Sequence, residues 1–348
     1  MLTYWLMYII PAFIVFILSS KQQKKLMPWL VIGFFFIILI GFREDVGGDW
    51  TNYLLHYDAM QYKTLWQAVS YGDPGHQFLN WLSYQWELGV YGVNFVYGFV
   101  FMIGLVKLSR LQTYPWLALV VAVPYLITVV AMGYSRQAMA IGLFMWAISY
   151  LDKGRFKTYI ALIFMAALFH KTALLLLPLG VFLYGKGKIL RILIVIPVLY
   201  GAWDLLLAKE QETLWHNYVD ANMKSQGAMI RVVMNLVPSL LLFIYTKEWK
   251  RSYNDYVFWF WIAVGSVLAL VLVNISSTAV DRMALYFIPI QLVVFARLPY
   301  LARNKISPIL TRLMIVLGYA LVLFIWLNFS LYAAAWIPYN NLLFMDIM

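Results

Sequence analysis

Long apolar runs, separated by short polar linkers, occupy most of the chain and constrain its fold more than any other feature. Crossing the hydrocarbon of a bilayer takes about 20 mostly apolar residues in a helix, and many of the runs approach that length. Hydrophobic residues make up 64% of the 348 residues and charged residues only 12%, whereas a soluble domain is about 25% charged. Because no water-soluble core could bury so much apolar surface, the sequence predicts an all-α polytopic membrane protein. The predicted spans lie near residues 3–19, 27–42, 92–108, 115–132, 135–151, 189–207, 230–246, 256–273, 283–298 and 309–329.

The apolar stretch 158–185 is long for one span and is interrupted midway by His170-Lys171-Thr172. If it were a single crossing, the 26 basic residues would divide about evenly between the two membrane faces. If it forms two short arms that meet at His170, most basic residues collect in the loops of one face. The positive-inside rule favours this second arrangement and makes that face cytoplasmic. We therefore expect a broken hairpin, about 11 to 12 membrane segments and both termini outside.

The remaining features indicate a single transmembrane domain over residues 1–348, with outer loops near 43–91 and 208–229. The first apolar run lacks a basic start and precedes KQQKK, which is typical of a retained span rather than a cleaved signal peptide. Apolar and aromatic residues in 43–91 predict short amphipathic helices on the membrane surface. The net charge of +11 lies in short clusters between apolar runs, which indicates topology signals rather than nucleic-acid binding.

A few basic residues lie away from the predicted cytoplasmic face, at span ends or at the hairpin apex: Arg43, Arg136, Lys171, Arg231 and Arg282. Ionisable groups at such depths are costly and usually mark pathways or binding sites. A structural role is open for each of them. Arg136, Lys171 and Arg231 could extend their charges to the membrane interface, and Arg282 could form an ion pair with Asp281.

The segment 43–53 is the hardest to explain by structure alone. It gathers charged side chains around two glycines: Arg43, Glu44, Asp45 and Asp49 around Gly47 and Gly48. Glycine lets a backbone turn sharply or approach a ligand closely. Several arginines that face one side suggest an anionic ligand, because a guanidinium matches phosphate oxygens in pairs. At a membrane face, that anion would be a lipid phosphate or diphosphate.

Missing motifs narrow the class of protein further. The sequence contains no GxxxxGKS/T phosphate loop, no GxGxxG after a strand, no HExxH and no CxxC. ATP-driven transport and zinc hydrolysis are therefore disfavoured, and the absence of cysteine excludes disulfides and thiolate metal sites. The carboxylates near Asp49 lack a clear paired motif for a divalent ion. We accordingly predict neither a metal nor another cofactor.

Four blocks of the sequence together resemble the EpsG-like branch of the Wzy polysaccharide polymerases: GFREDVGGDWTNY, YSRQAMAIGLFMWAISYL, ALFHKTALLLLPL and STAVDRMALYF. They follow the order of the family's blocks from about residue 40 to about residue 290, and so cover most of the chain. The resemblance implies a bacterial inner-membrane polymerase of O-antigen (lipopolysaccharide), capsule or exopolysaccharide, with a GT-C-like glycosyltransferase architecture. Such enzymes join oligosaccharide repeats carried on undecaprenyl diphosphate at the outer face of the membrane. A flippase and a chain-length regulator of the same pathway are the implied protein partners.

The resemblance carries over to these residues: Arg43, Gly48, Asp49, Tyr53, Arg136, His170 and Arg282. The family often has threonine or a similar residue between the glycine and the aspartate, where this chain has Gly48. In the implied reaction, fixed cations stabilise the departing diphosphate, and a general base takes the proton of the attacking sugar hydroxyl. The expected cations are Arg43, Arg136 and Arg282, with Arg231 and Lys171. The candidate bases are Asp49, Asp45 and His170, and the residues expected to shape the loop or contact sugar are Gly47, Gly48, Tyr53 and Asp281.

Three other functions remain open from the sequence. A ligase would move finished glycan from the same lipid to a different acceptor. A flippase or transporter of the lipid-linked unit would place charges along a path through both leaflets and would show internal repeats, whereas the unusual charges here favour one face. A membrane O-acyltransferase could use His170 as its base, but it would leave the phosphate-type arginines unexplained.

Overall fold

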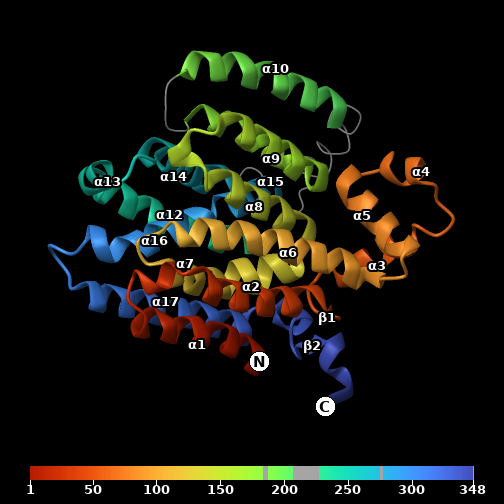
Figure 1. Ribbon diagram of the computed structural model, residues 1–348, viewed down its shortest axis with the longest axis horizontal. Coiled ribbons are helices and arrows are strands. Elements are labelled where there is room, and N and C mark those ends of the chain that lie inside the picture. The colour runs from red at the N-terminus through yellow and green to blue at the C-terminus, as the bar shows by residue number, and fades with distance from the viewer. Residues whose placement is uncertain (183–186, 207–226, 275–276, 348) are drawn as a thin grey trace.

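The computed structural model describes residues 1–182, 187–206, 227–274 and 277–347. Most of this part of the chain is helical and strands are very few, which confirms the predicted all-α polytopic fold (Figure 1). The first half contains α1 (Leu2–Ile17), α2 (Leu26–Gly41), α3 (Trp50–Asp58), α4 (Leu65–Val69), α5 (Pro74–Gln85), α6 (Gly89–Arg110), α7 (Pro115–Ala122), α8 (Ser135–Ile148) and α9 (Phe156–Phe169). The second half contains α10 (Lys188–Leu206), α12 (Ala228–Ile244), α13 (Thr246–Ser252), α14 (Tyr256–Leu272), α15 (Ser277–Phe287), α16 (Pro289–Leu301) and α17 (Pro308–Phe329).

Among the described residues, two helices are each long and apolar enough to cross a membrane, α6 and α17, with 22 residues apiece. Two helix pairs meet the same criteria together but bend at a break, by 77° between α12 and α13 and by 41° between α15 and α16. Most other predicted spans correspond to helices of 10–17 residues. In the run 115–132, α7 continues into a π-helix, η2 (Val123–Ala131), near Pro124, which cannot donate the regular helical hydrogen bond. The total of 11 to 12 membrane segments stays a prediction.

The interrupted stretch near His170 forms a hairpin. α9 ends at Phe169, His170 is extended (φ −154°, ψ 105°), and a 3-10 helix, η4 (Lys171–Phe182), follows. The Tyr159 hydroxyl donates to the Leu176 carbonyl at 2.7 Å, and a Cβ at Gly180 would lie 2.9 Å from the Tyr159 ring. The two arms therefore run antiparallel, which confirms the predicted turn at His170. Residues 183–185 of the predicted hairpin lie outside the described residues.

Glycines bring α6 and α8 into backbone contact near the middle of the bundle (Figure 1). A Cβ added at Gly104 would overlap the Gly142 carbonyl oxygen, and one at Gly142 would lie 2.5 Å from the Cα of Phe101. Membrane helices associate through such small residues, because lipid provides no hydrophobic force between them. α7 and most of α8 are buried. This close-packed layer fixes the position of the first turn of α8.

The segment 43–91 lies beside the bundle (Figure 1), and we call it the outer unit after its predicted position on the outer face. It contains α3, α4 and α5, as expected for short helices, and α4 begins with a capping box at Thr64. Its first residues form β1 (Arg43–Glu44), which pairs antiparallel with β2 (Asn340–Asn341) near the C-terminus. The outer unit is therefore anchored to the far end of the chain. Of the second predicted outer loop, near 208–229, residues 208–226 lie outside the described residues.

Candidate functional site

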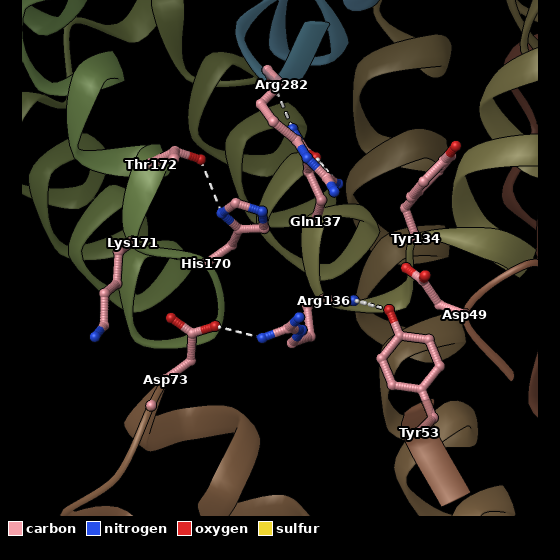
Figure 2. A pocket seen from close by; sticks show the side chains of 11 residues that line it. Asp49, Tyr53, Asp73, Tyr134, Arg136, Gln137, His170, Lys171, Thr172 and Arg282 are labelled. Carbon is pink, nitrogen blue, oxygen red and sulfur yellow. Dashed lines mark hydrogen bonds and ion pairs between the residues drawn. The ribbon is translucent and has the colours of Figure 1, made fainter. Parts of the chain in front are cut away.

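A cavity of about 220 Å³ lies where five distant parts of the chain meet. They are the start of α3, the loop before α5, the first turn of α8 with the turn of the hairpin opposite it, and α15 (Figure 2). The lining residues are Asp49, Tyr53, Gly72, Asp73, Tyr134, Arg136, Gln137, His170, Lys171, Thr172 and Arg282. Both ends of the lining carry an arginine, with carboxylates near one end and an imidazole near the other.

The structure brings together half of the residues expected from the sequence. Those that line the cavity are Asp49, Tyr53, Arg136, His170, Lys171 and Arg282. Those that lie outside its lining are Arg43, Asp45, Gly47, Gly48, Arg231 and Asp281. Arg43, Gly47, Arg231 and Asp281 nevertheless contact neighbouring elements of the bundle, whereas Asp45 and Gly48 are exposed.

Arg136 occupies the first turn of α8 and points toward the outer unit (Figure 2). Its Nη1 donates to Asp73 Oδ2 at 3.1 Å, while its side chain remains 38% exposed. Its backbone N–H approaches the Tyr53 hydroxyl at 3.5 Å. The first turn of a helix leaves N–H groups unsatisfied and carries a partial positive charge. This corner therefore presents both a guanidinium and a helix N-terminus to an anion.

Arg282 reaches the other end of the cavity from α15. Its Nη1 donates to Gln137 Oε1 at 3.4 Å, and the amide of Gln137 donates back to the Arg282 carbonyl at 2.7 Å. Its guanidinium also lies over the Tyr134 ring, 5.5 Å from the centroid. The contacts with α8 hold this charge toward the same cavity as Arg136 (Figure 2).

His170 is oriented by the hairpin that it interrupts. Its Nδ1 forms a hydrogen bond of 2.8 Å with the Thr172 hydroxyl, which lies 3.3 Å from the Tyr286 hydroxyl. The Tyr286 ring meets the imidazole edge-on. With Nδ1 occupied, Nε2 is the ring nitrogen available to the cavity. Lys171, the next residue, also lines the cavity and is 9% exposed.

Two carboxylates line the cavity, and the sequence drew attention to only one. Asp49 precedes α3 but its side chain caps no backbone N–H of that helix. In Figure 2 it lies beside Tyr53 and Tyr134. Asp73, the partner of Arg136, stands in YGDPG, which reads as an ordinary turn before the proline that opens α5. Tyr134, Gln137 and Thr172 were likewise missed, because polar residues next to a charged motif carry no signal of their own.

Arg43 lies behind the cavity rather than in it. The side chain is fully buried, and its nitrogens donate to the carbonyl oxygens of Ile40 and Val46 and to the side chains of Asn94 and Ser135. Burial lowers the pKa of Arg43 to about 10, so the group stays charged at neutral pH. It joins the end of α2, the loop that precedes Asp49, α6 and the start of α8.

The loop between Arg43 and Asp49 depends on one of its two glycines. Gly47 has φ +107°, and a Cβ there would collide with the Met132 carbonyl oxygen. A Cβ on Gly48 would have no neighbour within 4 Å. Asp45 is exposed, with φ +48°. Gly47 therefore shapes the loop, whereas Gly48 leaves space beside Asp49 that a side chain could occupy.

Arg231 and Asp281 form a buried ion pair between α12 and α15, in which Nη2 lies 2.6 Å from Oδ2. The Tyr125 hydroxyl accepts a hydrogen bond from Arg231 Nη1 at 3.0 Å. The sequence did not suggest Arg231 as the partner of Asp281. The ion pair fixes α15, and with it Arg282, against the bundle.

A chain of hydrogen bonds runs behind Tyr53. His56 Nδ1 lies 2.9 Å from His76 Nε2, and His76 Nδ1 lies 2.6 Å from the Tyr97 hydroxyl. The Tyr53 ring meets both imidazoles edge-on. Burial, reinforced by the charge of Arg136, lowers the pKa of His56 and lowers the pKa of His76 further. These groups support Tyr53 but do not line the cavity.

Comparison with known proteins gives a family for this chain. A family model described as the EpsG family matches residues 26–341, which is nearly the whole chain. No curated protein and no solved structure matches. Within the described residues, no group of three or more His, Asp or Glu side chains is arranged to hold a metal ion.

Proposed function

The chain belongs to the EpsG family, and from this premise we propose that it polymerises oligosaccharide repeat units carried on undecaprenyl diphosphate. Membership supports a polysaccharide polymerase-like role in general. The observation that supports the specific reaction is the cavity, where Arg136, Lys171 and Arg282 surround a space also lined by Asp49 and His170. The cations can stabilise an anionic leaving group, and Asp49 or His170 can act as a general base for the nucleophile.

The leaving group is the lipid diphosphate. As the bond between the anomeric carbon and the diphosphate oxygen breaks, negative charge grows on that oxygen. Arg136 and Arg282 can form paired hydrogen bonds with phosphate oxygens, and the N-terminus of α8 adds its partial positive charge. Asp73 holds Arg136 in place and so reduces the cost of positioning it. Arg43 acts as a positioning residue, because its own donors are occupied by the protein.

The nucleophile is a sugar hydroxyl of the second lipid-linked chain. Its oxygen bonds to the anomeric carbon, its proton passes to a general base, and undecaprenyl diphosphate departs. Asp49 or the Nε2 of His170 takes the proton. A single displacement of this kind inverts the anomeric centre.

The reaction takes place on the outer face of the bacterial inner membrane. This orientation rests on the distribution of basic residues and on the lining of the cavity, to which the predicted outer segment contributes Asp49, Tyr53 and Asp73. The lipid-linked unit arrives after a flippase has moved it across the membrane, and a chain-length regulator is the expected partner.

A polymerisation assay tests this function. Full-length protein in liposomes that contain undecaprenyl-diphosphate-linked repeats should produce a ladder of longer lipid-linked chains, without nucleotide sugar and in the presence of EDTA. The double variant Arg136→Gln/Arg282→Gln should produce no ladder. Lys63→Gln, which removes a cation of the outer unit away from the cavity lining, should behave like the native protein.

Other results would identify a different function. Transfer of glycan only to an added acceptor, without growth of the lipid-linked chain, would indicate a ligase. Movement of the lipid between leaflets without chain growth would indicate a flippase. Activity that EDTA abolishes and magnesium restores would contradict catalysis by side chains alone.

A further inference from the structure

A second, larger opening lies between α9 and α10, away from the catalytic cavity. Its volume is about 970 Å³. Its walls are mostly apolar and include Ile160, Phe164 and Ile194. Figure 1 shows α10 at the edge of the bundle beside α9, so the opening faces the surroundings of the protein rather than its core. In a membrane protein those surroundings are lipid.

One end of this groove is strongly basic. Arg155, Lys157 and Arg191 all line it, and no acidic side chain is among the described residues that do so. Arg191 is only 6% exposed, and its guanidinium lies 5.8 Å from the centroid of the Phe156 ring. Both α9 and α10 begin at this end, so two partial positive charges of helix N-termini add to the three side chains.

The groove thus combines an apolar wall with a cationic end, which is the chemistry of an anionic lipid. We propose that it binds an anionic phospholipid, with the phosphate at Arg155, Lys157 and Arg191 and an acyl chain along α9 and α10. Basic side chains at a membrane surface each attract anionic lipid appreciably. A soluble anion would leave the apolar wall without a ligand group to contact. A zwitterionic lipid carries no net charge and would be attracted less strongly by the basic side chains.

This site is separate from the catalytic cavity. α9 runs from the basic end of the groove to His170, and its 14 residues correspond to about 21 Å of helix. The phospholipid therefore lies in the opposite leaflet from the cavity. A substrate lipid whose diphosphate occupies the cavity could not place that diphosphate in the groove.

The experiment compares binding of two lipids to the purified full-length protein in detergent by native mass spectrometry. Phosphatidylglycerol should bind more tightly than phosphatidylcholine. Arg155→Gln/Lys157→Gln/Arg191→Gln should weaken phosphatidylglycerol binding by about tenfold or more. Lys21→Gln/Lys24→Gln/Lys25→Gln removes the same charge from an exposed linker outside the groove and should leave binding unchanged.

A second variant tests the apolar wall without changing charge. Ala161→Trp should fill the groove, lower binding of phosphatidylglycerol, and leave binding of glycerol 1-phosphate as weak as in the native protein. Equal binding of the two lipids, or equal losses in the groove and linker variants, would overturn the proposal. So would tight binding of glycerol 1-phosphate alone, which would indicate a soluble phosphate as the ligand. The melting temperature of each variant shows whether it remains folded.

Discussion

At the scale of single residues, two arginines that look alike in the sequence have opposite surroundings. Arg43 is fully buried with protein acceptors on every side, whereas Arg136 keeps 38% of its side chain exposed in the cavity. Both lie just after the end of an apolar run, so their positions in the sequence could not distinguish them. Substitution of Arg43 should therefore lower stability, whereas substitution of Arg136 should lower activity.

Lysine at Arg136 or Arg282 keeps the charge but loses the planar fork that binds phosphate oxygens in pairs. Each substitution should lower the rate of polymerisation by about tenfold or more, with a melting temperature near that of the native protein. Arg43→Lys should instead lower the melting temperature, because losing buried charged hydrogen bonds costs about 3 kcal/mol. Activity and detergent melting curves measured on the same samples check this, and unchanged stability in Arg43→Lys would contradict the assignment.

The general base can be identified by neutral substitutions of nearly the same shape. If Asp49 takes the proton, Asp49→Asn should nearly stop chain growth but spare binding of the lipid donor. If the base is His170, the same result should appear in His170→Gln instead. Asp73→Asn serves as the comparison, since it should weaken donor binding through Arg136. Near-native chain growth in both base variants would remove Asp49 and His170 from the reaction.

The pair of His76, which is buried, and His56, which is half-buried, makes stability depend on pH. Because burial lowers the pKa of His56 and of His76 below the unfolded value, the unfolded chain binds more protons as the pH falls through about 6.5. The stability that these groups contribute is therefore complete above that pH and is lost below it. The melting temperature should fall between pH 7.5 and pH 5. In His76→Gln the fall should be smaller, and an identical slope would exclude the pair as its source.

At the scale of elements, the loop between β1 and α3 sets the position of Asp49. Gly47→Ala should disrupt it, because φ +107° is unfavourable for alanine and the new Cβ would meet the backbone at Met132. We expect a loss of roughly 1 kcal/mol or more in stability and a marked loss of activity. Gly48→Thr is the matched control, because a Cβ at Gly48 would meet no atom within 4 Å and open space receives the side chain. Melting temperature and chain growth measured for both variants check this, and a Gly47→Ala variant that behaves like Gly48→Thr would contradict it.

The hairpin of α9 and η4 is the second element that creates the site. Its turn places His170, Lys171 and Thr172 opposite the first turn of α8, which carries Arg136 (Figure 2). An uninterrupted helix through these residues would distribute them around its circumference. The break in helical structure is therefore what aims the imidazole and the lysine at one cavity.

At the scale of the whole molecule, the orientation in the membrane follows from the hairpin. If both its ends lie on the cytoplasmic face, a reporter that is active only in the cytoplasm should be active when fused after Lys188 or after Lys250. Fused after Glu87, in the outer unit, it should be inactive. Silence at both of the first two positions would mean that residues 158–185 cross the membrane once, since every later loop would then change sides.

The sequence alone determined the class of fold, the hairpin turn at His170 and about half of the residues in the cavity. The length of apolar runs and the placement of charges can be read directly from the sequence, so predictions based on them need no knowledge of packing. The tertiary structure decided which arginines face the cavity, that Asp281 pairs with Arg231, and that Asp73 joins the site. Those outcomes depend on contacts between residues far apart in the chain. An example is the contact between Asp73 and Arg136, whose sequence separation is 63. The energy of a charged side chain depends on which partner it meets, and only the packed helices bring that partner within reach.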